Sequence, residues 1–241
     1  MKPWQLYGTL LATIVFTTSV IATGCSSAGS ATKLRGDSIL IDQLESSLLE
    51  NIRRSVDYTI RSTGAFEVSL SGSLFIGEQR DISILADGLF GEMPVNLIYA
   101  STGDSVFGSN GSIVFDGISP DSLKNAVVIG LSRMGLLHNL AMLISGSPPD
   151  HAEGGAAEWV RFENYGERML RDSSDLYCSF DIIVNGVRSG TAELWFDPTT
   201  HLPRLRRQHV EFSDGVMDVE EVYTWHSDDR IIRDPATLRS E

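Results

Sequence analysis

Apolar and polar residues alternate over much of the chain, beginning at Phe66. From Phe66 to Ile76 most apolar residues stand at every second position, with a glutamate and serines between them. This period is typical of a strand with one buried face. Shorter strands are predicted around Ile82–Ala86, Val95–Ser101, Ser105–Gly108 and Ser112–Phe115, separated by turn-forming residues. Residues 65–116 therefore predict an antiparallel meander with one apolar face.

A second β-rich block follows residue 158. Short strands are predicted at Trp159–Tyr165 and Arg168–Leu170, then longer ones at Leu176–Val184 and Arg188–Phe196 around Asn185-Gly186. A simple two-residue turn would put the apolar residues of the two long strands on opposite faces. A three-residue connection or a bulge sets Phe180 opposite Ala192, Cys178 opposite Leu194 and Leu176 opposite Phe196, so we predict that register.

The last predicted hairpin turns at Ser213-Asp214-Gly215. Its apolar face is expected to carry Met217, Val219, Tyr223 and Trp225. Arg204, Arg206 and Arg207 face an acidic segment, Asp218–Glu221, and predict pairing of charges across the two strands rather than an anion site.

Two regions have helical spacing. The first is an apolar stripe at steps of three and four that Gly64 would end, formed by Ile41, Leu44, Leu48, Ile52, Val56 and Ile60. The second, Leu123–Ile144, is apolar on nearly every side, and Gly130 and Gly135 mark either a break or a close approach. A helix that is apolar all round needs cover on every side, which could be protein or an acyl chain.

The first residues are predicted to form a targeting segment. Lys2 precedes the apolar run Leu10–Ile21, and Ala22-Thr23-Gly24-Cys25 resembles a bacterial lipobox in which Cys25 becomes the acylated N-terminus. The alternative is an uncleaved anchor, or an ordinary signal peptide with a chance cysteine. We expect a signal peptide at 1–24, a flexible tether at 25–38, one domain at 39–227 and a polar tail at 228–241.

Composition narrows the classes of function. The chain has 42% hydrophobic residues, 21% charged residues and a net charge of −13, which is typical of a globular protein and argues against nucleic acid as a partner. Cys178 is expected to be a buried thiol, because it stands in the apolar alternation of Leu176–Val184, and acylation of Cys25 would leave it without a cysteine to pair with. His201 and His209 are expected to be structural. No motif for catalysis, a metal or a cofactor is present, so we expect a protein that is not an enzyme.

Three loose motifs resemble the LolA/LolB-like superfamily, which includes the LppX/LprG-type lipoproteins. They are the segment Pro94–Gly117 ending in Asp116-Gly117, the helix at Pro120, and Leu194-x-x-Asp197-x-x-Thr200-x-Leu202-Pro203. The resemblance implies an α+β fold in which helices plug the concave face of a curved, incomplete antiparallel β-barrel. No counterpart can be placed for the arginine that gates the mouth in LolA itself, so lipid binding is better supported than lipoprotein transfer.

The resemblance implies a lipid-anchored protein of the bacterial cell envelope, on the periplasmic face of the outer membrane. It would bind or transfer a lipid or lipoprotein acyl chain, act as a monomer and meet an envelope partner. The residues expected to line its cavity are Val127, Leu131, Met134, Leu137, Leu140, Phe180, Leu194 and Phe196. Leu89 and Phe90 would form a membrane-contact loop, unless they end a strand and stay in the core. The alternative function is a regulatory interaction module with a filled cavity, as in RseB-like proteins.

Acylation of Cys25 can be tested directly. Cys25→Ser removes the only cysteine of the lipobox-like segment, so the variant should leave the membrane fraction in a high-salt wash, measured by immunoblotting of fractions. Cys178→Ser is the control and should stay bound. A Cys25→Ser protein that remained in the membrane fraction would contradict lipid anchoring.

Overall fold

The computed structural model describes residues 40–50, 53–78, 80–147, 160–169, 175–213 and 215–226, together with Leu238. The chain divides into two units, residues 1–39 and residues 40–241, and all described residues belong to the second. The predicted signal peptide, Cys25, the tether and most of the polar tail lie outside the described residues. Among the described helices, none has the length and apolar character needed to span a membrane.

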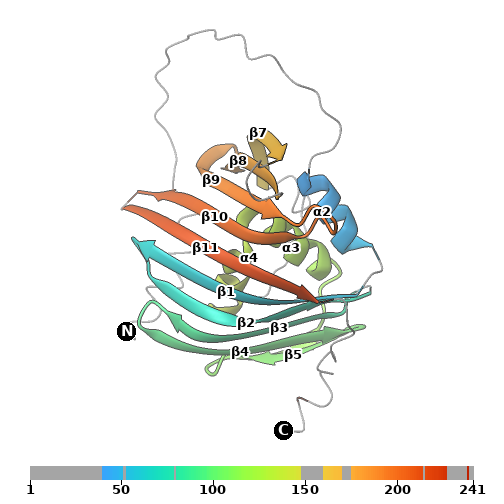
Figure 1. The fold of residues 1–241 in the computed structure, drawn as a ribbon. Coiled ribbons are helices and arrows are strands. Elements are labelled where there is room, and N and C mark those ends of the chain that lie inside the picture. Colours follow the sequence, from blue (N-terminus) through green and yellow to red (C-terminus); the bar gives the residue numbers. More distant parts are fainter. Residues whose placement is uncertain are drawn as a thin grey trace. The chain divides into compact units, whose positions relative to one another are not determined.

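The described part of the chain combines short helices with long strands (Figure 1). The helices are α2 (Leu40–Leu49), α3 (Leu123–Ile129) and α4 (Leu136–Ile144), with the π-helical turn η1 (Gly130–Met134) joining the last two. The strands are β1 (Arg54–Gly64), β2 (Val68–Ile76), β3 (Ile82–Phe90), β4 (Met93–Thr102), β5 (Ser105–Ser109), β6 (Val114–Ile118), β7 (Val160–Met169), β8 (Leu176–Val184), β9 (Val187–Phe196), β10 (Pro203–Phe212) and β11 (Gly215–His226).

The strands form one antiparallel sheet in the order β6-β5-β4-β3-β2-β1-β11-β10-β9-β8-β7. All neighbours are consecutive in the chain except β1 and β11, whose pairing joins the two β-rich blocks. In this order the sheet does not close, because β6 and β7 stand at opposite ends. Figure 1 shows the strands curving, with α3 and α4 behind them. The predicted α+β architecture, an open antiparallel sheet with helices against one face, is confirmed.

The first predicted helix is only half right. The helix ends at Leu49, and Val56 and Ile60 belong instead to β1, at the centre of the sheet. A spacing of four is also a multiple of two, so residues 52, 56 and 60 fit one face of a strand as well as one face of a helix. Pairing of β1 with both β2 and β11 decides between the two, and that pairing involves residues far away in the sequence.

The second helical region contains both features that its glycines predicted. At Gly135 the chain breaks with a φ of +89°, and α4 begins one residue later. Gly130 is a close approach, because a Cβ there would lie 2.2 Å from Oδ1 of Asn139, whose amide donates to the carbonyl of Val127 at 2.9 Å. Asn139 on α4 therefore ties α4 to α3 across the turn.

The hairpin of β8 and β9 has the predicted register. Phe180 lies opposite Ala192, Cys178 opposite Leu194 and Leu176 opposite Phe196. The turn itself is a two-residue one at Asn185-Gly186, and a register shift after Ile182 brings the apolar residues back to one face. The two short strands predicted before this hairpin are one strand, β7, with an irregularity between Glu163 and Gly166.

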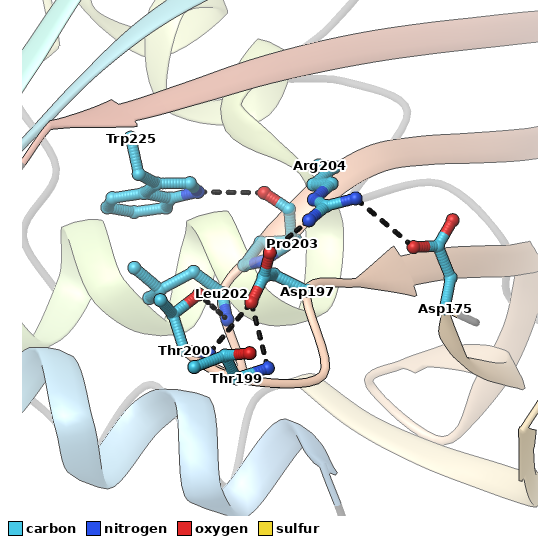
Figure 2. Close-up of polar contacts among 8 residues, drawn as sticks. All are labelled: Asp175, Asp197, Thr199, Thr200, Leu202, Pro203, Arg204 and Trp225. Carbon is cyan, nitrogen blue, oxygen red and sulfur yellow. Dashed lines mark hydrogen bonds and ion pairs between the residues drawn. The ribbon is translucent and has the colours of Figure 1, made fainter. Parts of the chain in front are cut away.

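The corner between β9 and β10 explains the third motif (Figure 2). The carboxylate of Asp197 accepts hydrogen bonds from the backbone N–H groups of Thr199 and Thr200 at 2.8 and 2.9 Å, and also pairs with Arg204. The indole N–H of Trp225 donates to the carbonyl of Pro203 at 2.7 Å, which fixes the corner to β11. The polar residues of this motif therefore shape a turn.

Asp197 should make stability sensitive to acid. Hydrogen bonds from Thr200 and Thr199, and then Arg204, lower the pKa of Asp197 to about 2, below its ordinary value of 3.8. Its stabilising effect is present above about pH 4 and disappears as pH falls through 2. Asp197→Asn should therefore unfold more easily than the wild type at pH 6, with the difference shrinking toward pH 2, in urea titrations at each pH. Glu92→Gln, at an exposed turn position, is the control and should show no such trend. A difference independent of pH would contradict the role of the carboxylate.

Candidate ligand-binding site

The residues predicted to line a cavity come together on the inner face of the sheet, the face that carries the helices. Phe180 on β8 and Leu194 and Phe196 on β9 share this face, because Phe180 lies opposite Ala192 and Leu194 opposite Cys178. Their helical counterparts, Val127, Leu131, Met134, Leu137 and Leu140, lie on α3, η1 and α4. The guanidinium of Arg206 links the two sets, since it lies 5.8 Å from the ring of Phe180 and bonds to η1.

These side chains are packed against protein in this structure. Val127, Leu140 and Phe196 have no accessible surface, Leu131 is 2% exposed, and only Met134 is not buried. A side chain with no accessible surface has no water-sized space beside it. Protein therefore covers these positions directly, and an acyl chain would have to take the place of some of that protein.

A buried pair of opposite charges fixes the helical layer to the sheet. Arg206 on β10 and Glu221 on β11 lie opposite each other in the register, and both are essentially unexposed. Arg206 donates to the backbone carbonyls of Ser132 and Arg133 at 2.9 and 2.7 Å. Glu221 accepts from the backbone N–H groups of Leu136 and Leu137 at 3.0 and 2.8 Å. The two side chains thus satisfy the last carbonyls before the break and the first N–H groups after it.

Gly135 is required at this break. Its φ of +89° is unfavourable for other residues, and a Cβ there would lie 2.8 Å from Oε1 of Glu221 and 3.1 Å from Nε of Arg206. The hydroxyl of Tyr223 also donates to Glu221. Burial, and then the charge of Glu221, raise the pKa of Tyr223 well above its ordinary value, so this hydroxyl keeps its proton. Burial lowers the pKa of Arg206, which the charge of Glu221 partly offsets.

A buried ion pair fixes α2. Arg133 on η1 donates from Nε and Nη2 to the two oxygens of Glu45 at 2.7 and 2.8 Å, and the hydroxyl of Ser132 donates to the same carboxylate at 2.6 Å. The guanidinium of Arg133 also lies 5.3 Å from the ring of Phe162 on β7. Burial, followed by the charge of Glu45, raises the pKa of the neighbouring Asp42. The turn η1 is thus bound to α2 on one side and to β10 on the other.

The predicted pairing of charges across the two strands is found for Arg207 and, inside the sheet, for Arg206, which lies opposite Glu221 in the register. Arg207 pairs across the strands with Glu220 at 3.0 Å, as expected. Arg206 points inward to the helices, and Arg204 pairs with Asp175 and Asp197 at the corner. A register shift between Pro203 and Leu205 separates these side chains. The sequence did hold a signal for Glu221, because it stands in phase with Val219 and Tyr223 on the predicted apolar face.

The remaining residues singled out from the sequence lie at several different positions in the fold. Leu89 and Phe90 end β3, but only Phe90 is in the core, against the ring of Phe66 at 4.8 Å, while Leu89 is 49% exposed on the outer face. Cys178 is buried, as expected. His209 pairs with Asp218 at 2.8 Å on the outer face, and His201 sits in the corner. Within the described ranges, no cluster of three or more His, Cys, Asp or Glu could hold a metal ion.

Comparisons with known proteins find solved structures of similar fold at low sequence identity. No protein-family model and no curated protein matches the sequence. LprF from Mycobacterium bovis is 12% identical, over 81% of this chain and 95% of that chain, with a TM-score of 0.37. A LolA superfamily protein from Nitrosomonas europaea is 10% identical, over 80% and 93%, with a TM-score of 0.33. A putative outer membrane lipoprotein-sorting protein domain from Vibrio parahaemolyticus is 9% identical, over 83% and 96%, with a TM-score of 0.34.

The buried opposite charges of Arg206 and Glu221 predict a large difference between two adjacent arginines. Arg206→Met leaves Glu221 charged, buried and without its opposite charge, which should reduce the free energy of unfolding by about 3–5 kcal/mol. Arg207→Met removes an exposed pair and should cost about 0–1 kcal/mol. Urea unfolding of both variants measures the difference. Equal effects would show that the buried pair does not hold the helical layer.

Proposed function

We propose that this protein is a lipid-anchored component of the bacterial cell envelope that binds or transfers a lipid or lipoprotein acyl chain between the sheet and its helices. One observation carries the proposal. The segment from Leu123 to Ile144 is a single layer of helix, yet it is buried on nearly every side; the exceptions are Asn125, Met134, His138 and Met142. Apolar contacts have no required direction, so an acyl chain can replace protein against such a layer at little cost in free energy.

The envelope location rests on the N-terminal sequence and on the motif resemblance. Acylated Cys25 would hold the protein on the membrane, with the tether at 25–38 leading to the domain at 39–227 and the tail at 228–241 following it. The periplasmic face of the outer membrane, a monomeric state, an envelope protein partner and the lack of enzymatic activity belong to the same proposal. Leu89, exposed at the end of β3, is its membrane-contact residue, whereas Phe90 is buried.

A filled interior favours a second candidate function. Val127, Leu140 and Phe196 have no accessible surface, which is what a regulatory interaction module with a collapsed cavity would show. The two functions differ in what the interior contacts in the cell. Lipidomics or native mass spectrometry of the protein purified from its host separates them, because only the first function gives a bound lipid in a defined ratio.

Substitution of Leu131 provides a sharper test. In a binding site, Leu131→Ala should cost less stability than the roughly 2–5 kcal/mol of a packed core leucine. Leu131→Trp should lower the amount of bound lipid by filling its space. Thermal unfolding and lipid per protein are the two measurements.

Leu48→Ala is the matched control, because Leu48 on α2 is equally buried and lies outside the proposed site. It should lose the full stability of a core leucine and keep its lipid. If both Leu131 variants were as destabilised as this control and retained the same lipid content, the proposed site would be ordinary core.

A further inference from the structure

The turns at the two ends of the strands differ in the kind of contact that joins them to their neighbours. At one end, which we call the polar end, lie the β2–β3 turn, the β4–β5 turn and the start of α3. Arg80 joins these three, because it pairs with Asp104 at 2.9 Å and with Asp121. Asp81 accepts from the N–H of Gly103 at 3.3 Å.

Lys124 adds to the polar end from α3. Its buried ammonium group donates to the carbonyl of Gly77 at 2.8 Å and to that of Glu50 at 3.3 Å, joining α3 to the β2–β3 turn and to the residue after α2. Burial lowers the pKa of Lys124. Ion pairs and charged hydrogen bonds therefore join these two turns to α3 and to the residue after α2.

The opposite end consists of hairpin turns, three of which contact one another through backbone and apolar groups. We call the turns β1–β2, β3–β4 and β10–β11 the hairpin rim. The N–H of Gly91 donates to the carbonyl of Glu67, and the N–H of Ala65 donates to that of Val216, both at 2.8 Å. Three large apolar side chains are exposed along this rim: Leu89, Met93 and Val216.

The inward side chains also differ in exposure between the two ends of the strands. Near the polar end, Val56, Ile76 and Ile82 have no accessible surface. Near the hairpin rim, the inward residues Val68, Phe90, Val95 and Met217 expose 4–7% of theirs. On α4, Leu137 and Ala141 are 7% and 6% exposed. The inner side of the hairpin rim and these two residues of α4 therefore keep some contact with solvent, whereas β1, β2 and β3 have none at the polar end.

Charge at the rim restricts what can enter. Glu67 and Glu92 are exposed there. Residues 64–68 and 89–94, and the described part of 212–216, contain no Lys, Arg or His. A phosphate or carboxylate headgroup with net negative charge would be repelled at this place, whereas a zwitterionic headgroup would not.

From these observations we infer that an acyl chain enters the interior at the hairpin rim, tail first, and that its headgroup stays at the rim and carries no net negative charge. The inference rests on the proposed function and specifies both its route and its class of lipid. The polar end keeps its ion pairs during binding, so the helices there stay attached to the sheet.

Photolabelling of the full-length chain tests the route. Two lysophosphatidylcholine probes of equal length carry a diazirine either beside the headgroup or at the chain terminus, and mass spectrometry locates the labelled peptides. The headgroup-side probe should label 64–70 and 88–97, and the terminal probe should label residues deeper in the sheet or helices. Headgroup-side labelling at 77–81, 102–104 or 119–124 would overturn the route while leaving lipid binding in place. No labelling by either probe would overturn the proposed function itself.

Competition between headgroups tests the class of lipid. Unlabelled lysophosphatidylcholine should displace the probe at lower concentration than lysophosphatidylglycerol of the same chain length. In the Glu67→Gln/Glu92→Gln variant this preference should fall by roughly two- to threefold, the size expected for screened charges several ångströms apart. Glu50→Gln, an exposed acidic position at the polar end, is the control and should leave it unchanged. Equal or tighter binding of the anionic lipid by the wild type would overturn the charge restriction.

Discussion

The structure depends on one buried interaction, the pair formed by Arg206 and Glu221 with the broken helix above it. The pair supplies acceptors and donors to the backbone groups that the break at Gly135 leaves without helical partners. Without it, carbonyls and N–H groups would be buried and unsatisfied in an apolar interior, which costs about 1–3 kcal/mol for each group. It therefore fixes both where the helical layer bends and which part of the sheet it contacts.

Around that point the rest of the interior is apolar, and this contrast has consequences for function. Polar contacts hold the helical layer at a few places. Arg206 binds η1, Glu45 on α2 pairs with Arg133 on η1, and Lys124 on α3 binds the β2–β3 turn. The amide of Asn110 donates to the last carbonyls of α4. Between these places the contacts are hydrophobic and exchangeable. A layer fixed at separate points and apolar between them can admit a chain without losing its position, because the directional bonds need not break.

The same contrast separates the two ends of the sheet. The ion pairs of Arg80 join two turns of the polar end to the start of α3, whereas the three turns of the hairpin rim contact one another through backbone hydrogen bonds. If the protein holds a lipid, the polar end fixes the helices while the hairpin rim faces the membrane or the donor. If the interior stays filled, the exposed apolar side chains of the rim remain available to a protein partner.

Sequence by itself determined the strands with clean alternation, the all-round apolar helices, the two glycine positions between them and the register of the β8–β9 hairpin. Each of these depends on a period of two or 3.6, or on keeping apolar residues on one face, which neighbouring residues suffice to define. Tertiary structure decided the fate of Val56 and Ile60, whose spacing fits helix and strand alike until β1 pairs with β11. It also decided the role of Arg206, because a single register shift at Pro203 turns it from the solvent face to the interior. Both outcomes depend on contacts between residues far apart in the chain, and no local pattern encodes the free energy of such contacts.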